Sequence, residues 1–371
     1  MRTEKVAVIL MNLGGPDCLE AVQPFLFNLF YDPAIIRLPN PFRYLIAKLI
    51  SSTRKKKAEN IYSQMGGKSP ILEETLMQAE ELKTLLKQDD KCEYKVYVAM
   101  RYWKSFSGEI MPDVINYQPD QIILVPLYPH FSTTTTASSI KDFMVNLHVH
   151  NYEGLVKAIG CYFLDDKFIE CHVDLIRETL SKVKDDNYKI LFSAHGLPKS
   201  IIRDGDPYQW QTEQTVAKIA SNLSLSEEQY QITYQSRVGP VKWLEPNTEH
   251  VIESLAQKGV NIIVIPISFV SEHSETLVEL DIEYKSIADK YGVHYWRVPT
   301  LRILKKFISS LANNIQKFAR IDSNITSSNK LKRMCPSNFS KCICKNLEED
   351  TTNFEEDTKN FEEFVSSAYN N

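Results

Sequence analysis

The segment IILVPLYPHFSTTTT at residues 122–136 is similar to IIVIPISFVSEHSET at residues 262–276. A second matching pair lies upstream of each, YKVYVAMR at residues 94–101 and YQITYQSR at residues 230–237. Buried strands draw on few residue types, so either pair alone could arise by chance. Because both pairs occur in the same order and at nearly the same spacing, duplication is the better interpretation. We therefore expect two similar lobes with a cleft between them.

Short apolar runs alternate with amphipathic stretches along the chain. Strands are predicted at residues 6–10, 95–99, 121–125, 189–192, 231–234 and 261–265. Helical periodicity covers residues 73–86, 168–180, 249–257 and 276–288. This alternation is typical of α/β folds built on parallel sheets.

The composition of the 371 residues is that of an ordinary globular protein, with 43% hydrophobic and 24% charged residues. The net charge of −4 gives no argument for nucleic acid as a partner. No apolar run approaches the roughly 18 residues of a membrane-spanning helix. Seven cysteines without a recognisable signal peptide favour a reducing compartment. The sequence therefore predicts a cytoplasmic protein.

Motifs for nucleotide binding and for common hydrolases are missing. GGKS at residues 66–69 resembles the end of a P-loop, but Tyr62 occupies the position of the first glycine. No G-x-S-x-G or H-E-x-x-H segment occurs. We therefore expect no nucleotide cofactor.

His195 is the strongest single candidate for a functional residue. It lies in SAHGLP, directly after the predicted strand at residues 189–192. Ligands of open α/β sheets bind at the carboxyl ends of strands. A histidine there can act as a general base or as a metal ligand near neutral pH. The alternative is a histidine that packs at the interface between lobes.

A second candidate is the acidic row in SFVSEHSETLVELDIEY at residues 268–284. An α-helix with Ser271 as its N-cap would place four carboxylates on one face. They belong to Glu272, Glu275, Glu279 and Glu283. Such a row is often only a solvated helix face. Because this row begins beside His195 in the expected cleft, imidazole and carboxylate together suit a loosely held divalent metal.

The stretch PNPFRYLIAKLISSTRKKK at residues 39–57 joins an apolar face to a basic run. Apolar residues between positions 42 and 50 recur at helical spacing. This pattern suits contact with a membrane surface or an apolar ligand, or an ordinary helix packed on the core.

Several of these segments together are similar to one known family. They are MNLGGP at 11–16, YSQMGGKSPI at 62–71, LYPHFS at 127–132, FSAHGLP at 192–198, QSRVGPVKWLEP at 235–246 and SFVSEHSETLVELDIEY at 268–284. The chain resembles the ferrochelatases, which insert ferrous iron into a porphyrin in the last step of haem synthesis. The resemblance implies an α/β fold of two similar Rossmann-like lobes of the chelatase type, each a parallel sheet flanked by helices, with the porphyrin in the cleft.

The resemblance also implies residue roles. It assigns His195 to the porphyrin centre, as a metal ligand or as the base that removes the pyrrole protons. Glu275 would be the second metal or proton site and would face His195 across the macrocycle, with Glu279 and Glu283 continuing a path for protons or iron. Pocket-lining positions would be Arg101, Tyr102, Tyr128, Trp243, Phe269 and His273. The helix at residues 42–50 matches an apolar lip over the cleft, which suits loose contact with a membrane surface.

One departure concerns the porphyrin carboxylates. Ser63 and Gln64 stand where some ferrochelatases carry basic residues that meet these carboxylates. Lys68 or Lys48 would then have to take their place.

The cysteines near the C-terminus are similar to those of ferrochelatases with a 2Fe–2S cluster. Cys171 matches the internal ligand of those members, and Cys335, Cys342 and Cys344 stand near the other three. The C-x6-C-x-C spacing differs from the animal pattern. The alternative is that these thiols lie in a flexible tail and bind no cluster.

The expected organisation is an N-terminal lobe over residues 1–160 with its lip at 34–53, and a C-terminal lobe over 161–318. Residues 319–371 would form a linker, a cysteine segment and an acidic disordered tail. The expected activity is insertion of Fe2+ into protoporphyrin IX with release of two protons, in the cytoplasm or at the surface of the inner membrane. Alternatives are a chelatase for coproporphyrin or cobalt, a non-catalytic haem or iron carrier on the same fold, and an electron-transfer protein built on the tail cysteines.

Overall fold

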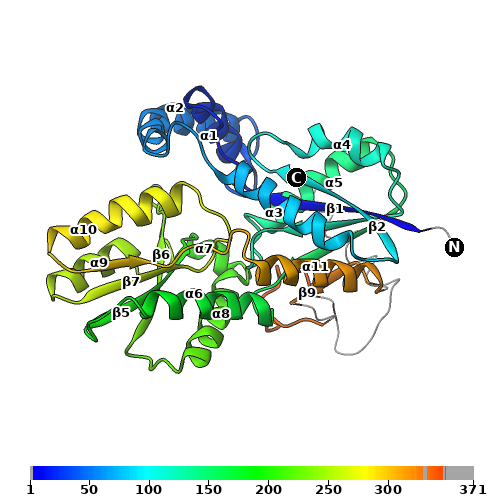
Figure 1. Ribbon diagram of the computed structural model, residues 1–371. Helices are drawn as coiled ribbons and strands as arrows, with labels where there is room; N and C mark the ends of the chain where they lie inside the picture. The colour runs from blue at the N-terminus through cyan, green and yellow to red at the C-terminus, as the bar shows by residue number, and fades with distance from the viewer. Residues whose placement is uncertain (1–2, 322, 329–331, 346, 348–371) are drawn as a thin grey trace.

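Two parallel sheets form the two lobes of the computed structural model, which describes residues 3–321, 323–328, 332–345 and 347 (Figure 1). The first contains β1 (Glu4–Asn12), β2 (Cys92–Met100), β3 (Gln121–Pro126), β4 (Leu155–Cys161) and β9 (Ile325–Ser327). The second contains β5 (Tyr188–His195), β6 (Tyr230–Gln235), β7 (Asn261–Pro266) and β8 (Tyr295–Arg297). The strand orders are β2-β1-β3-β4-β9 and β6-β5-β7-β8. The first four strands of each lobe therefore follow the same order, which matches the internal repeat and confirms the α/β class.

All six predicted strands are present, but the short apolar-run criterion missed three others. In β4 a lysine interrupts the apolar run, yet Lys157 is 2% exposed. Its Nζ donates hydrogen bonds to the carbonyls of Phe318 and Ile321, at 3.1 and 2.7 Å. These carbonyls lie at the end of the last helix, so only the folded chain shows why a lysine is tolerated in this strand.

Helices cover both sheets, and two of them project together from the first lobe. They are α1 (Val22–Tyr31), α2 (Phe42–Ser63), α3 (Ile71–Leu86), α4 (Ser107–Asn116), α5 (Thr136–Val149), α6 (Asp166–Leu180), α7 (Lys199–Arg203), α8 (Tyr208–Leu223), α9 (Thr248–Gln257), α10 (Lys285–Lys290) and α11 (Lys305–Ala319), with the short 3-10 helix η1 (Leu19–Ala21) and the π-helix η2 (Glu275–Tyr284). Figure 1 shows α1 and α2 projecting from the first lobe on the side of α10. Their apolar faces pack together around Val22, Phe25 and Tyr62.

The predicted helix at residues 276–288 differs from the structure over residues 276–284. These residues belong to the π-helix η2, whose i→i+5 hydrogen bonds are rare and frequently occur at functional sites, and α10 follows it. Ser271 is not the N-cap, because its hydroxyl donates to Gln78 Oε1 at 3.2 Å and the helix begins at Glu275. Glu272 is therefore outside the helix.

The two lobes share one core. Buried residues from β1, β5, α6 and α11 belong to a single hydrophobic cluster, in which α11 packs against α3 and α6. The chain therefore returns to the first lobe after building the second, and the shared core holds the two sheets in place on either side of the cleft.

The segment expected as a linker is partly a strand. β9 pairs in parallel with β4, with Cys161 opposite Ser327. The expectation of a linker is thus wrong for residues 325–327, because the edge of β4 offers unpaired backbone groups that this segment satisfies. The expected acidic tail at residues 348–371 lies outside the described residues. Within the described part of the chain no helix is long and apolar enough to cross a membrane.

Candidate active site

A cavity of about 1120 Å³ lies between the projecting helices and the second lobe. Its walls come from α1, α2, η2 and the loops that follow β1, β3, β5, β6 and β7. These loops leave the carboxyl ends of parallel strands, where α/β sheets bind ligands. Ligand pockets commonly measure about 300–1,000 Å³, so this cavity suits a large ligand.

His195 is the last residue of β5 and lines this cavity. Its backbone carbonyl accepts a hydrogen bond from the Tyr208 hydroxyl at 3.0 Å. A Cβ on Gly196 would lie 2.8 Å from the carbonyl oxygen of Gln235, so only glycine allows β6 to approach this closely. The sequence therefore places the imidazole at a tightly packed strand end.

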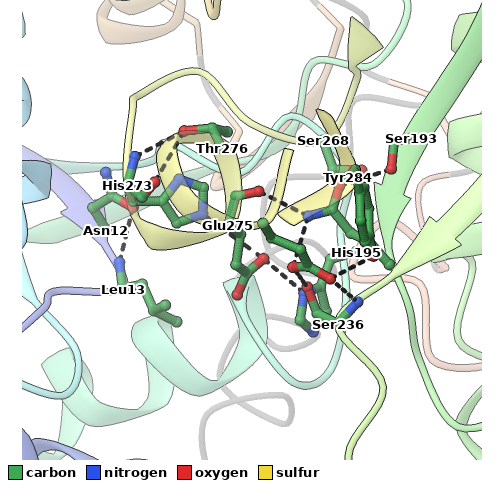
Figure 2. A network of polar contacts seen from close by, with 12 residues as sticks. Asn12, Leu13, Ser193, His195, Ser236, Ser268, His273, Glu275, Thr276 and Tyr284 are labelled. Carbon is green, nitrogen blue, oxygen red and sulfur yellow. Dashed lines mark hydrogen bonds and ion pairs between the residues drawn. The ribbon is translucent and has the colours of Figure 1, made fainter. Parts of the chain in front are cut away.

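The imidazole of His195 contacts the carboxylate of Glu275 directly. Nδ1 and Oε2 are 2.9 Å apart, and Figure 2 shows Glu275 between His195 and His273. The distance from Glu275 Oε2 to His273 Nε2 is 3.8 Å. The expectation that Glu275 faces His195 across the macrocycle is wrong, because a 2.9 Å contact leaves no room for a ring between them. The two side chains therefore lie together on one wall of the cavity.

The pair shifts the protonation of both partners. Burial lowers the pKa of His195, but the adjacent Glu275 carboxylate outweighs this, and the pKa is raised above its ordinary value of 6.5. Burial favours the neutral form of Glu275, but His195 and His273 hold its pKa well below its usual range. The site therefore favours an ionised carboxylate beside an imidazole that gains a proton easily.

Glu279 continues the acidic row along η2. Its carboxylate accepts hydrogen bonds from the Ser236 amide at 2.8 Å, the Ser236 hydroxyl at 2.6 Å and the Tyr284 hydroxyl at 2.6 Å. Burial and the charge of Glu275 raise the pKa of Glu279 despite these donors. Glu279 can therefore take up a proton while Glu275 stays ionised. Glu283 also lines the cavity.

Glu272 does not belong to this row. Its Oε1 accepts hydrogen bonds from Arg297 at 2.7 Å and from the amide of Thr300 at 3.2 Å, outside the cavity lining. The prediction of four aligned carboxylates rested on an α-helix that begins before Glu272. The late start of η2 leaves three.

Five of the six expected pocket residues line the cavity. They are Tyr102, Tyr128, Trp243, Phe269 and His273. Arg101 does not, and this expectation is wrong. Its guanidinium contacts the buried Asp32 at 2.9 Å and Asp142 at 3.4 Å, so its charge is already balanced within the first lobe.

The family model for ferrochelatases matches residues 5–319. The chain belongs to the ferrochelatase family. The ferrochelatase of Rickettsia felis is 52% identical over 347 residues, which cover 92% of this chain and 98% of the relative. That of Pelagibacter ubique is 48% identical and covers 93% of this chain and 100% of the relative. The expectation of a metal chelatase is confirmed at the level of the family.

A comparison of folds agrees only loosely. The solved structure of SirB from Bacillus subtilis with Fe3+ covers 86% of this chain and 96% of SirB, with a TM-score of 0.49 and 11% sequence identity. That similarity is too weak to bear on the chemistry of this ferrochelatase-family site.

Two residues that hold the acidic row were not singled out from the sequence. Gln235 Nε2 donates to the backbone carbonyl of Glu275 at 3.0 Å and to Glu279 Oε2 at 3.1 Å, and Ser236 provides the two contacts above. Both lie in the ferrochelatase-like motif QSRVGPVKWLEP. Their position at the end of β6, the neighbour of β5, was the available signal.

Four cysteines come together in this ferrochelatase-family chain, but not the four that were expected. Gln211 Nε2 lies 3.6 Å from the sulfur of Cys161 and 3.2 Å from that of Cys335. Cys335 and Cys344 both lie close enough to Cys342 to shift the pKa of its thiol. All four side chains are buried in one hydrophobic cluster.

Cys171 is elsewhere, so its assignment to this group is wrong. It lies on α6 near Asp174 and Lys306, in a different hydrophobic cluster, where burial raises its pKa to about 12. The physical reason is the path of the chain after β9. Because β9 pairs with β4, the segment that follows passes Cys161 at the end of β4.

No group of three or more His, Cys, Asp or Glu side chains within the described ranges already has the arrangement of a metal site. The four thiols do offer the ligand type that iron–sulfur clusters require, and they are shielded from solvent. They would have to turn toward a common centre on binding. Burial raises the pKa of Cys161 well above its usual range, so this thiol stays protonated until a cation is present.

Proposed function

We propose that this protein inserts Fe2+ into protoporphyrin IX to give haem, with release of two protons. The observation that carries the proposal is the hydrogen-bonded pair of His195 and Glu275 on the wall of a large interlobe cavity. Membership of the ferrochelatase family supports the same reaction. The reaction needs a base for the pyrrole protons and a counter-charge for the cation that this base becomes, and the pair supplies both.

His195 is the base. Its Nδ1 is engaged by Glu275, and in the described part of the chain its Nε2 has no hydrogen-bond partner. With the proton on Nδ1, Nε2 presents a lone pair and accepts a pyrrole proton. The resulting imidazolium is stabilised by the ionised Glu275 at 2.9 Å, which is why the pKa of His195 is raised.

The acidic row then removes the proton or supplies the metal. Glu279 has a raised pKa and lies next along η2, so it can accept a proton from the His195–Glu275 pair, and Glu283 continues toward the outer end of η2. Iron is the substrate, and carboxylate oxygens and imidazole nitrogen are suitable transient ligands for ferrous iron.

The test is anaerobic metal insertion with ferrous iron and protoporphyrin IX. His195→Ala and Glu275→Ala are expected to lose insertion while still binding porphyrin, as measured by fluorescence. His150→Ala and Glu81→Ala, which change exposed residues of the same types, serve as matched controls and keep activity. If the wild type binds porphyrin but inserts neither iron nor cobalt, into either protoporphyrin IX or coproporphyrin, a carrier function replaces the proposal.

The exposed lip supports contact with a membrane surface. Phe42, Leu45 and Leu49 on α2 are 61%, 58% and 64% exposed, and the basic residues 54–57 follow on the same helix. Apolar side chains beside cations favour binding to anionic lipids. The triple variant Phe42→Ser, Leu45→Ser and Leu49→Ser should lose binding to anionic vesicles. Val149→Ser, at a 73% exposed position away from the lip, should not.

The four buried thiols support a 2Fe–2S cluster held by Cys161, Cys335, Cys342 and Cys344. A bound cluster would join β4 to the cysteine segment through its four cysteine ligands and so stabilise the fold. The test is the visible spectrum and the iron and sulfide content of anaerobically purified protein. Cys161→Ser is expected to lose both, and Cys171→Ser to keep both. Zinc without sulfide, or equal loss in the two variants, would contradict the assignment.

A further inference from the structure

A buried glutamine on α3 joins the two lobes beside the loop that leads to η2. Gln78 is fully buried and is not part of the cavity lining. Its Nε2 donates to the backbone carbonyls of Val270 and Arg302, at 3.2 and 3.0 Å. Its Oε1 accepts from the hydroxyl of Ser271 at 3.2 Å. All three partners lie in segments that follow strands of the second lobe, so one side chain of the first lobe holds two loops of the other.

A neighbouring side chain of α3 strengthens this contact. Glu74, one turn before Gln78, is buried and accepts from the Nε of Arg302 at 2.8 and 3.0 Å. The amide of Arg302 in turn donates to the carbonyl of Val270 at 2.8 Å. Charge-assisted hydrogen bonds are about twice as strong as neutral ones. The place where Gln78 meets the second lobe is therefore fixed.

The loop that Gln78 contacts runs directly into the first turn of η2. Ser271 is two residues before His273, whose amide donates to the Thr276 hydroxyl at 3.0 Å. The carbonyl of His273 accepts from the amide of Thr276 at 3.1 Å. Figure 2 shows Glu275 in this turn, between His273 and His195. A displacement of the loop would therefore carry the carboxylate of Glu275 with it.

The two members of the His195–Glu275 pair are supported in different ways. His195 ends β5, which lies between β6 and β7, so the sheet fixes its backbone on both sides. Glu275 depends on its loop and on η2. Gln235 and Arg297 also hold this segment, but both belong to the second lobe. Gln78 adds a contact from the first lobe.

We propose that Gln78 is a positioning residue for metal insertion. It fixes the loop at residues 270–273 against the first lobe and so keeps the carboxylate of Glu275 within hydrogen-bond distance of the His195 imidazole. The inference rests on the proposed function for the role of that pair. Because Gln78 is outside the cavity, its removal should affect the chemical step rather than porphyrin binding.

The experiment uses Gln78→Met, which keeps most of the side-chain volume and removes all three hydrogen bonds. In anaerobic insertion of Fe2+ into protoporphyrin IX, kcat should fall on the order of tenfold, because the pair is displaced. KM for the porphyrin should change by less than about twofold. The NMR signal of the His195 imidazole N–H proton, identified by its loss in His195→Ala, should move toward that of an imidazole without a carboxylate partner.

A second variant removes the other side of the contact. Ser271→Ala leaves the two backbone contacts of Gln78 in place and should lower kcat by less than Gln78→Met does. The double variant should be no worse than Gln78→Met alone, since residues that act through one contact are not additive. Additive losses in the double variant would contradict a shared role.

Gln121→Met is the matched control. Gln121 is 1% exposed, and its Nε2 donates to the carbonyl of Ala319 at 3.1 Å, at the amino end of β3 and away from the cavity. This variant should keep both kcat and the His195 signal. An equal fall of kcat in Gln121→Met, or an unchanged kcat and signal in Gln78→Met, would overturn the proposal.

Thermal unfolding of each variant separates these results from misfolding, and Ser271→Ala decides the question if Gln78→Met does not fold. If the wild type inserts no metal but the His195 signal still depends on Gln78, the proposed function fails and the contact between Gln78 and the pair stands.

Discussion

At the scale of single residues, one carboxylate controls the protonation of the site. Glu275 raises the pKa of His195 against the effect of burial, and the two histidines hold Glu275 ionised. The proton on His195 stabilises the fold below the ordinary pKa of 6.5 and is lost as the pH rises through the raised value. The charge on Glu275 has the opposite pH dependence, because its contribution to the stability of the fold is lost only as the pH falls through the lowered pKa of Glu275.

The first prediction concerns this coupling. In Glu275→Gln the pKa of His195 is expected to fall below its wild-type value. Burial lowers this pKa, and only the smaller coulombic effect of Glu279 would then oppose it. NMR titration of the histidine ring signals measures the change. Glu81→Gln, at an exposed site, should leave the titration as it is in the wild type. An unchanged His195 pKa in Glu275→Gln would show that the pair is not electrostatically coupled.

A second prediction at this scale concerns Gln211, whose Nε2 points to two cysteine sulfurs while its Oε1 accepts from the amide of Phe131 at 2.7 Å. Hydrogen bonds to cluster sulfurs favour the reduced, more negative state. Gln211→Glu and Gln211→Leu should both lower the reduction potential of the proposed cluster, as measured by an EPR-monitored titration. Gln214→Leu, on the same helix, is the control. An equal shift of the reduction potential in Gln214→Leu would contradict a specific role for Gln211.

At the scale of elements, the π-helix η2 is tied to the edge strand β8 by a buried ion-pair network. Arg297 contacts Glu272 at 2.7 Å and Asp281 at 2.6 Å, and the side chains of Arg297 and Glu272 are 13% and 9% exposed. These contacts anchor the loop before η2 through Glu272 and the helix η2 itself through Asp281. The position of Glu275 in the cavity therefore depends on a residue that is outside the cavity.

The third prediction tests this tie. Arg297→Met leaves Glu272 buried without its partner and should cost about 3–5 kcal/mol in the free energy of unfolding. Lys285→Met breaks the exposed pair with Asp289 on the neighbouring α10 and should cost less than about 1 kcal/mol. Urea unfolding followed by circular dichroism gives both values. Similar losses in the two variants would mean that the network adds no more than a surface pair.

At the scale of the whole molecule, one loop links the cysteine segment to the cavity. The carbonyl of Gly205 accepts from the amide of Lys341 at 3.1 Å. Asp206 accepts from the amide of Thr133 at 2.7 Å, and the hydroxyl of Tyr208 reaches His195. The cysteine segment is thus packed on the same loop that supports the strand end carrying His195, in line with a structural role for the proposed cluster.

The fourth prediction concerns Gly205, which has a φ of +97° and would place a Cβ 2.5 Å from Ser340 Oγ. Gly205→Ala should displace the cysteine segment and lower the iron and sulfide content per chain. Gly259→Ala is a matched control, because its φ is +71° and nothing lies within 4 Å. Both variants carry the strain of a side chain at positive φ, on the order of 1 kcal/mol. If cluster content falls equally in both, the contact with Ser340 is irrelevant.

Local sequence patterns were enough to predict the two-lobe α/β architecture and to name the central residues of the candidate site. The repeated strands, SAHGLP and the acidic run are local patterns, and burial of apolar strands leaves few ways to arrange them. His195 could therefore be named without coordinates because it follows a predicted strand, and Glu275 and Glu279 because they belong to the acidic row.

The contacts between segments distant in the chain emerged only from the folded arrangement. It placed Glu275 beside His195 rather than opposite it, removed Glu272 and Arg101 from the cavity by pairing them with Arg297 and Asp32, and replaced Cys171 with Cys161. Spacing along the chain cannot reveal such pairs, because a charged or thiol side chain is directed by the partner it meets across the fold. That partner is set by strand pairing and by where a helix begins, as β9 and η2 demonstrate.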